Sequence, residues 1–268
     1  MLKYLLFVLF LPFATFSQDR KTPEHHFTVI AHRGYYQRAP ENTLKAVEDA
    51  IAIGADYVEI DLRTTNDGVL INMHDASLKR MCGIDKQVNK LTYAEIKTLK
   101  VRDEQHPEFG EHAIPTFEQI LHVSKGRRAI YIDFKDADVL QTLDYIKQAQ
   151  MENAVVVYVY TKTQLDVWRA LAPQIPIIIS LPEKVKSTKK MKEVLQAYPT
   201  NILDGNYKEY KSITVKAAQK SGVPVWADIQ SATESSKQWK KAIKTGMKGL
   251  QTDHPKELIE YLIKQGVR

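Results

Sequence analysis

Ionisable side chains recur two residues apart within short apolar runs of this sequence. Glu59 and Asp61 belong to one such run, and Asp133 and Lys135 close a later one. Residues i and i+2 of a strand project from the same face, so the members of each pair share a face. A carboxylate pair buried between strands and helices without partners would cost a prohibitive free energy. In a parallel barrel, these side chains are therefore expected at the interior mouth.

Clustered carboxylates repel one another and raise their own pKa values unless positive charge lies between them. A hard divalent cation supplies that charge, and oxygen ligands favour Mg²⁺ or Ca²⁺ over zinc or copper. A salt-bridge network is the alternative, in which Glu59 or Asp61 pairs with Arg33, Arg63 or Lys135. The residues themselves leave both interpretations open and favour the metal.

Two histidines, His32 and His74, end the first and third apolar runs and flank the acidic pair in the sequence. A histidine pair beside a metal suits proton transfer to and from oxygen near neutral pH. Arg33 and Lys135 add two cations, of which arginine presents a planar fork that matches phosphate oxygens and lysine acts as a point charge. Together these groups predict phosphoryl chemistry on an anionic substrate.

Several other functional classes lack their motifs in this chain. A glycosidase needs two free carboxylates and no phosphate clamp, which does not match the cations found here. The sequence contains no G-x-S-x-G elbow, so a serine hydrolase is poorly supported. It also contains no G-x-G-x-x-G or Walker loop, which disfavours a nucleotide-binding fold.

The elements that position these residues alternate between strand and helix. Apolar, β-branched runs predict strands at residues 28–32, 57–62, 69–74, 129–134, 155–160, 175–180, 201–204, 223–227 and 249–252. Amphipathic segments predict helices at residues 41–53, 92–99, 116–123, 139–151, 163–172, 185–197, 211–221, 233–244 and 255–264. Eight or nine βα units in a chain of this length predict an α/β fold, the TIM (β/α)₈ barrel. A doubly wound open sheet is the competing architecture.

The composition is that of an ordinary globular chain. Its 268 residues are 44% hydrophobic and 26% charged, which fits one large α/β domain or two small ones. Cys82 is the single cysteine and excludes an intramolecular disulfide framework and a cysteine-rich zinc site. The net charge of +6 favours anionic partners, but it is modest for this length, so no nucleic-acid partner is expected.

Residues 1–17 predict a secretory signal peptide. One positive charge precedes a short apolar run, and small residues at positions 15 and 17 precede a cleavage point before Gln18. The run is shorter than the roughly 20 residues of a membrane span, so stable membrane insertion is not expected, although an uncleaved anchor helix is the alternative. The expected organisation is a signal peptide (1–17), an N-terminal arm (18–27) and a barrel domain (28–268) of an exported protein, periplasmic or secreted.

The segment from residue 29 to residue 75 resembles the signature of glycerophosphodiester phosphodiesterases. The matching motifs are His32-Arg33-Gly34, Pro40-Glu41-Asn42-Thr43, Gly54-Ala55, Glu59-Ile60-Asp61, Thr65, Asp67-Gly68 and His74-Asp75. Weaker matches follow downstream, at Leu78, Arg80, Leu91, Glu95, Leu99, Ile114-Pro115-Thr116-Phe117-Glu118 and Thr252-Asp253-His254-Pro255. The resemblance covers about residues 28 to 262, nearly the whole chain after the predicted signal peptide.

This resemblance implies a TIM barrel with a small insertion after the second barrel strand, and it assigns roles to the residues above. A divalent metal, Ca²⁺ or Mg²⁺, is expected on Glu59, Asp61 and Asp133, and the imidazoles of His32 and His74 are expected to act as acid and base. The implied reaction splits a glycerophosphodiester into an alcohol and glycerol 3-phosphate. The attacking group is a water or the substrate's own 2-hydroxyl, through a cyclic phosphate.

Three further residues have expected roles around this centre. Arg33 and Lys135 are expected to bind the phosphate, and Glu41 is expected to support the site, at the edge of the metal or by holding Arg33. Glu41 is also explained as a first-turn carboxylate favoured by a helix dipole. The oligomeric state is not predicted.

Two departures from the family pattern bear on the substrate. The usual Glu-x-Lys is Asp133-Phe134-Lys135 here, and the usual Trp-Thr-Val-Asn is Trp226-Ala227-Asp228-Ile229. The second change replaces polar residues near the leaving-group pocket. The alternatives are therefore an enzyme for glycerophosphoinositol or intact phospholipid, and a catalytically silent phosphodiester-binding protein.

Overall fold

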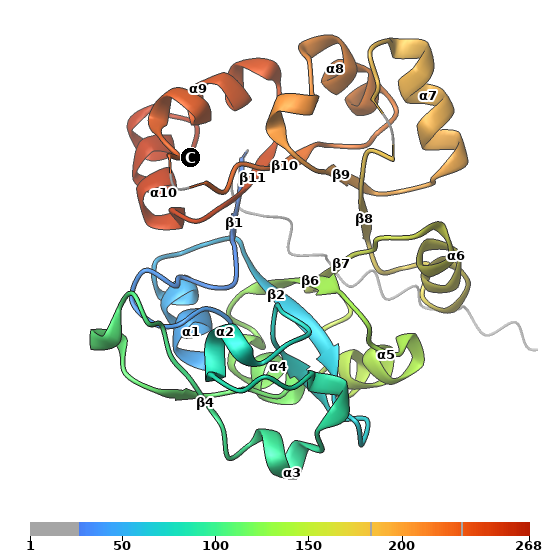
Figure 1. Cartoon of the computed structure of the whole chain (residues 1–268). Helices are drawn as coiled ribbons and strands as arrows, with labels where there is room; N and C mark the ends of the chain where they lie inside the picture. Colours follow the sequence, from blue (N-terminus) through green and yellow to red (C-terminus); the bar gives the residue numbers. More distant parts are fainter. Residues whose placement is uncertain (1–26, 183, 232) are drawn as a thin grey trace, which may run out of the picture.

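Eight parallel strands form a nearly closed barrel in the structure, a computed structural model that describes residues 27–182, 184–231 and 233–268 (Figure 1). The barrel strands are β1 (Thr28–Ala31), β2 (Tyr57–Thr64), β6 (Ala129–Phe134), β7 (Val155–Tyr158), β8 (Ile177–Ser180), β9 (Ile202–Asp204), β10 (Trp226–Asp228) and β11 (Gly249–Thr252). The predicted signal peptide and nearly all of the predicted arm lie outside the described residues.

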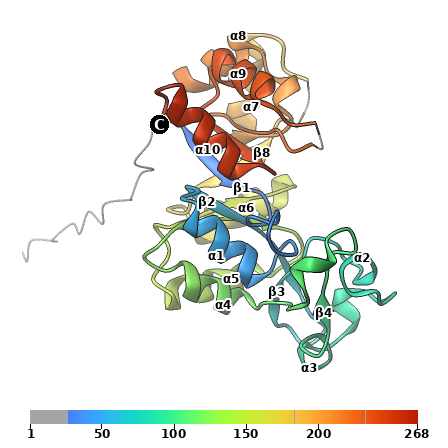
Figure 2. The same ribbon diagram turned by 90° about the vertical axis from the view of Figure 1, so that its left-hand side faces the viewer.

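One helix follows each barrel strand and covers its outer side (Figures 1 and 2). These helices are α1 (Leu44–Ala52), α4 (Phe117–Ser124), α5 (Val139–Gln148), α6 (Lys162–Leu171), α7 (Thr188–Ala197), α8 (Ser212–Lys220), α9 (Ser236–Thr245) and α10 (Pro255–Lys264). Asp138 and Thr161 explain two of the starts, because each accepts a hydrogen bond from the main-chain N–H three residues later. Within the described residues, no helix combines the length and the hydropathy needed to cross a membrane.

The strands follow one another around the barrel in chain order. β1 pairs in parallel with β2 on one side and with β11 on the other, so the first and last barrel strands are neighbours. Between β9 and β10 the circle is completed by two single bridges, Leu203 to Val225 and Asn206 to Asp228. This order confirms the predicted barrel and excludes the doubly wound open sheet.

The barrel interior has an apolar floor and a polar layer above it. The floor is the buried cluster of Ile30, Tyr131, Val156, Ile178, Ile202 and Trp226. Two residues later on the same strands, and hence on the same face, come His32, Asp133, Tyr158, Ser180, Asp204 and Asp228. Gly249 makes room in this floor, because a Cβ atom there would lie 2.7 Å from Cδ1 of Trp226. The strand period therefore places these six polar groups at the carboxyl end of the barrel.

A small insertion lies between β2 and α4 and stands beside the barrel (Figure 2). It contains β3 (Leu70–Asn72), α2 (Lys79–Cys82), α3 (Tyr93–Ile96), β4 (Lys100–Val101) and β5 (His112–Ala113), with 3₁₀ turns at Val88–Lys90 and Pro107–Phe109. Ten buried side chains, from Ile71 to Ile114, form a core of its own. Its position confirms the insertion that the family resemblance implies.

The predicted strand at residues 69–74 requires a correction. Its central part, β3, pairs antiparallel with β2 and is not one of the barrel strands. The two strands are joined by a tight turn at Gly68, whose φ is 84°, whereas a parallel pair needs a crossover of a dozen or more residues. His74 consequently lies two residues beyond a hairpin and not at the end of a barrel strand.

Candidate functional site

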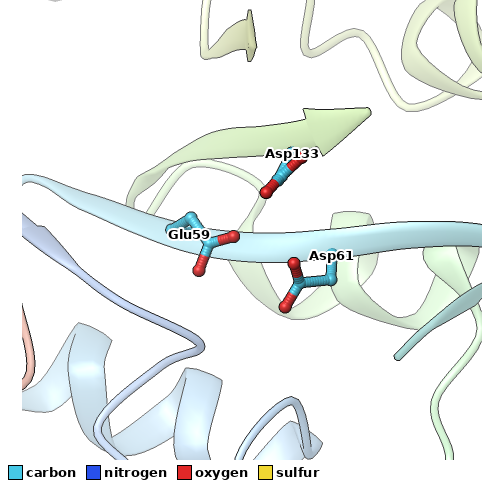
Figure 3. Close-up of side chains that lie close together, drawn as sticks. All are labelled: Glu59, Asp61 and Asp133. Carbon is cyan, nitrogen blue, oxygen red and sulfur yellow. The ribbon is translucent and has the colours of Figure 1, made fainter. Parts of the chain in front are cut away.

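Three carboxylates meet at the carboxyl end of the barrel, where β2 and β6 lie side by side. Glu59 and Asp61 project from the same side of β2, and Asp133 approaches from β6, where it pairs in register with Asp61 (Figure 3). One oxygen of each lies within 4.8 Å of the others. Glu59 and Asp61 are only 2% and 1% exposed. The i, i+2 prediction for this cluster agrees with the structure.

Asp61 is the best compensated member of the three. Its Oδ1 lies 3.0 Å from Nζ of Lys135, and its Oδ2 accepts a hydrogen bond of 2.8 Å from Asn42. The guanidinium of Arg33 lies 3.7 Å from the same Oδ2. Burial opposes ionisation of Asp61, but the charges of Lys135, His74 and Arg33 outweigh it and lower its pKa. The salt bridges predicted as an alternative are therefore present at this residue.

Glu59 and Asp133 have too little positive charge around them. Burial, followed by the charges of Asp61 and Asp133, raises the pKa of Glu59 well above its usual value, although the main-chain N–H of Arg33 donates to it at 2.6 Å. Burial and Asp61 also raise the pKa of Asp133, despite its ion pair with Lys135. The buried Oδ1 of Asp133 has no hydrogen-bond partner among the described residues. An oxygen cluster with one unsatisfied ligand atom and surplus negative charge fits a hard divalent cation.

The loop after β1 reaches this cluster through a strained backbone. Arg33 and Gly34 both have positive φ, 53° and 83°. A Cβ atom at Gly34 would lie 2.7 Å from the main-chain carbon of Ala46 in α1, so only glycine fits this close approach. Arg33 adopts a conformation that costs a non-glycine residue of order 1–3 kcal/mol. The strain turns its N–H toward Glu59 and its side chain toward Asp61.

His32 follows β1 and is held by a carboxylate from the far end of the chain. Its Nδ1 lies 2.7 Å from Oδ1 of Asp253, which follows β11. Burial opposes ionisation of Asp253, but the hydrogen bond and the charge of His32 lower its pKa. The two residues are brought together because β1 and β11 are neighbours in the barrel.

His74 has the same arrangement with a nearer carboxylate. Its Nδ1 lies 2.7 Å from Oδ1 of Asp75, and its main-chain oxygen accepts two hydrogen bonds from Arg63, of 2.9 and 2.8 Å. Arg80 approaches the other oxygen of Asp75 at 2.6 Å. Burial opposes ionisation of Asp75, but Arg80 and His74 lower its pKa to about 2. Arg63 thus positions His74, and it does not pair with the acidic cluster.

Glu41 connects the loops that carry the two histidines. It accepts from Arg33 at 2.9 Å and from Arg80 at 2.7 and 2.9 Å. Arg33 belongs to the loop after β1, whereas Arg80 belongs to α2 of the insertion. The expectation that Glu41 holds Arg33 agrees with this geometry. These contacts do not test whether Glu41 lies at the edge of the metal.

A cleft of about 290 Å³ opens between these groups. His32, His74, Asp133 and Lys135 line it, together with Tyr131, Tyr158, Tyr160, Asp204, Asp228, Gln230 and Gln251. A second, wider hollow of about 610 Å³ lies on the insertion side and shares His74 with the cleft. The structure therefore brings the two predicted histidines and one carboxylate of the acidic cluster, Asp133, to one cavity.

Several residues at this site were not predicted from the sequence. They are Asp253 and Asp75, which hold the histidines, Asn42 and Tyr160, which contact the acidic cluster, and Arg80, which contacts Asp75. Asn42, Asp75, Arg80 and Asp253 all lie in motifs of the family signature, so the sequence carried a signal for them. Tyr160 donates to Asp133 at 2.9 Å and lies in no such motif.

The barrel and its acidic, histidine-flanked mouth define an enzyme of the (β/α)₈ class. The sequence profile of the glycerophosphoryl diester phosphodiesterase family matches residues 32–257. The chain belongs to that family, which confirms the resemblance found in its motifs.

Relatives and solved structures of the same family align along most of the chain. Glycerophosphodiester phosphodiesterases of Caldanaerobacter subterraneus and Bacillus altitudinis are 27% and 26% identical, over 89% and 87% of this chain and 98% and 96% of theirs. The structure of a glycerophosphodiester phosphodiesterase from Agrobacterium tumefaciens aligns with a TM-score of 0.77 at 22% identity, over 87% of this chain and 99% of that one. An Oleispira antarctica phosphodiesterase, solved with the product sn-glycerol-3-phosphate, aligns with a TM-score of 0.75 at 23% identity, over 88% and 96%.

The raised pKa of Glu59 predicts how the stability of the chain depends on pH in EDTA. The folded state binds this proton more tightly than the unfolded state, so the stabilisation is present below the unfolded pKa and is lost as pH rises through the folded pKa. The variant Glu59→Gln cannot ionise at this position, so it should not lose stability in this way as the pH rises. We expect its melting temperature at about pH 8 to exceed that of the wild type by about 3 °C, or about 1 kcal/mol, and the gain to vanish near pH 4.

Thermal unfolding followed by circular dichroism measures this difference. Glu104→Gln, at an exposed position of the insertion outside any helix, is the matched control and should leave the melting temperature unchanged at both pH values. A Glu59→Gln variant that is no more stable than the wild type at the higher pH would contradict the surplus of negative charge at this site.

Proposed function

We propose that the chain hydrolyses glycerophosphodiesters to an alcohol and glycerol 3-phosphate, and that it requires a divalent cation. The observation that carries the proposal is the convergence of two imidazoles, each held by an aspartate, on one cleft beside a buried carboxylate cluster. Family membership supports the reaction class. The cleft also has the cations that an anionic phosphodiester needs.

Glu59, Asp61 and Asp133 would hold the cation, Ca²⁺ or Mg²⁺. The all-oxygen ligand set, the unsatisfied Oδ1 of Asp133 and the raised pKa of Glu59 support this assignment. When bound, the ion neutralises charge on the phosphate group. Asn42 and Lys135 keep Asp61 ionised and oriented toward the cluster.

His32 and His74 would act as the acid/base pair. Each ring has its Nδ1 on an aspartate, which leaves Nε2 as the nitrogen for the substrate. One imidazole takes the proton from the attacking hydroxyl or water, and the other gives a proton to the oxygen of the departing alcohol when its bond to phosphorus breaks. The aspartates stabilise the imidazolium that forms on either side.

Arg33 and Lys135 would bind the phosphate. Lys135 lies at the cleft wall and the Arg33 side chain lies at the edge of the cluster, so both can approach phosphate oxygens while they face Asp61. Glu41 would position Arg33 by its ion pair at 2.9 Å. The phosphate would thus be held from the same wall of the cleft as the cation.

Removal of either imidazole should abolish turnover without unfolding the chain. We expect His32→Ala and His74→Ala each to lower kcat on a glycerophosphodiester by about 10²- to 10⁴-fold, since each variant lacks one proton-transfer group. Release of glycerol 3-phosphate measures the rate, and urea unfolding checks the fold. His122→Ala, at an exposed position of α4, is the control and should retain wild-type activity. Near-wild-type turnover in either cleft variant would exclude the acid/base assignment.

Loss of one cluster carboxylate should remove the effect of the ion on stability. A ligand that binds only the folded state stabilises it by about 2.7 kcal/mol at 100 times its Kd, so added Ca²⁺ or Mg²⁺ should raise the melting temperature of the wild type. We expect Asp61→Ala to lose this rise together with the EDTA-sensitive activity. Asp144→Ala, exposed on α5, serves as the control. An unchanged rise in Asp61→Ala would place the ion elsewhere.

We also propose that the chain is exported to the periplasm or secreted, and that residues 1–17 direct this export and are removed. The charged start, the short apolar run and the small residues before Gln18 support the proposal. Expression of the full chain should yield an extracytoplasmic protein whose N-terminal sequence begins at Gln18. Retention of residues 1–17 on the exported protein would instead indicate an uncleaved anchor.

A further inference from the structure

The cleft has a second acidic wall, which lacks the lysine that faces the first. Asp204 on β9, Asp228 on β10 and Gln251 on β11 belong to the polar layer of the barrel, opposite β2 and β6 in the strand order. Asp228 and Gln251 are partners in register. Neither aspartate contacts the catalytic cluster described above, so this wall is not explained by acid/base chemistry or by the cation.

Asp204 is a buried acid whose hydrogen bonds come from neutral groups. It is 2% exposed, and the hydroxyl of Tyr131 donates to its Oδ2 at 2.5 Å. Its Oδ1 is buried and has no hydrogen-bond donor among the described residues. Burial and the charge of Asp228 raise the pKa of Asp204 well above its usual value. Both its burial and its neighbour therefore oppose ionisation of Asp204.

Asp228 also has a raised pKa, because its burial outweighs its hydrogen bonds and the opposing charges of His32 and Lys135. Its Oδ1 accepts hydrogen bonds from Gln230 at 3.2 Å and from Gln251 at 3.1 Å, both uncharged donors. In the part of the chain that the structure describes, no lysine or arginine nitrogen lies within 4.0 Å of either aspartate. A largely buried carboxylate without a counter-ion is costly, and a cation from the substrate would relieve that cost.

Aromatic rings on β7 and just after it lie between the acids of β6 and the wall of β9 and β10 in the strand order. Tyr158 follows the floor residue of β7, and Tyr160 lies edge-on to it, with their ring centroids 4.9 Å apart. The hydroxyl of Tyr158 is 3.1 Å from that of Ser180, and burial raises the pKa of Tyr158 to about 12, so it stays neutral. Ring faces of this kind attract alkylammonium groups.

We propose that Asp204, Asp228 and Tyr158 form the subsite for a positively charged head group, so that the preferred substrates are zwitterionic diesters with an alkylammonium alcohol. The proposal rests on the hydrolysis proposed above and names its substrate class. Phosphate would face Lys135 and the cation, and the ammonium group would face Asp228. A neutral polyol would find hydrogen bonds at Gln230 and Gln251 but would leave the carboxylate without a counter-ion.

Substrate preference of an isosteric variant tests the charge. We expect Asp228→Asn to lower kcat/KM for glycerophosphocholine and glycerophosphoethanolamine by about tenfold, or about 1.4 kcal/mol. For glycerophosphoglycerol, whose head group is uncharged, kcat/KM should change by less than about threefold, or about 0.7 kcal/mol. The two ammonium substrates separate a quaternary from a primary head group. An equal loss on all three diesters would overturn the proposal.

Ser180→Ala is the matched control on the same wall. It removes a neutral hydroxyl that touches Tyr158 and leaves the charge of Asp228 in place. It should leave the ratio of kcat/KM between ammonium and glycerol diesters unchanged. If it shifts this ratio as far as Asp228→Asn does, packing and not charge sets the preference, and the proposal fails.

Binding by the wild type tests the subsite without turnover and without a variant. Calorimetric titration should show that choline binds at least about tenfold more tightly than dimethylbutanol, in which carbon replaces the nitrogen, a difference of about 1.4 kcal/mol. Equal affinities would overturn the proposal. If choline binds selectively but no glycerophosphodiester is hydrolysed, the proposed reaction is wrong and the ammonium subsite stands.

Discussion

The burial of negative charge at one end of the barrel is the constraint on which the rest of this structure depends. Glu59 and Asp61 are almost fully buried and face Asp133 across two paired strands. Lysine, arginine and amide groups satisfy one of the three acids, and the other two remain poorly compensated. The strained loop at Arg33 has its explanation here, because that backbone places one more N–H donor against the acids.

The two-residue period of the strands places the packing residues and the polar residues at different levels of the barrel interior. Ile30, Tyr131 and Trp226 fill the interior, and the residues two positions later lie above them without disturbing that packing. The circular order of the strands then decides which polar groups share a wall. β2 and β6 carry the acids that Lys135 faces, whereas β9 and β10 carry a carboxyl pair served only by neutral donors. The two acidic walls of the cleft therefore differ in the groups that compensate their carboxylates.

The sequence predicted the part of the site that depends only on the local period of a strand. Glu59 and Asp61 share a face because they are two residues apart, and this remains true in any strand. The partner of His32, in contrast, is 221 residues away, and only the pairing of β1 with β11 brings it close. The proximity of Asp204 to Asp228 likewise depends on barrel closure, so the sequence showed Asp228 only as a departure from the family motif and did not indicate Asp204. The strand at residues 69–74 was misplaced because its apolar pattern does not reveal the hairpin.

The contact between His32 and Asp253 also orders events during folding. The carboxylate cluster and both histidines lie in the first half of the chain, but the acceptor for His32 lies in the segment that follows the final strand. A polypeptide without β11 and the residues after it therefore lacks the carboxylate that orients the first imidazole. β11 follows the other barrel strands in the chain, so the site has its full geometry only when this strand pairs with β1.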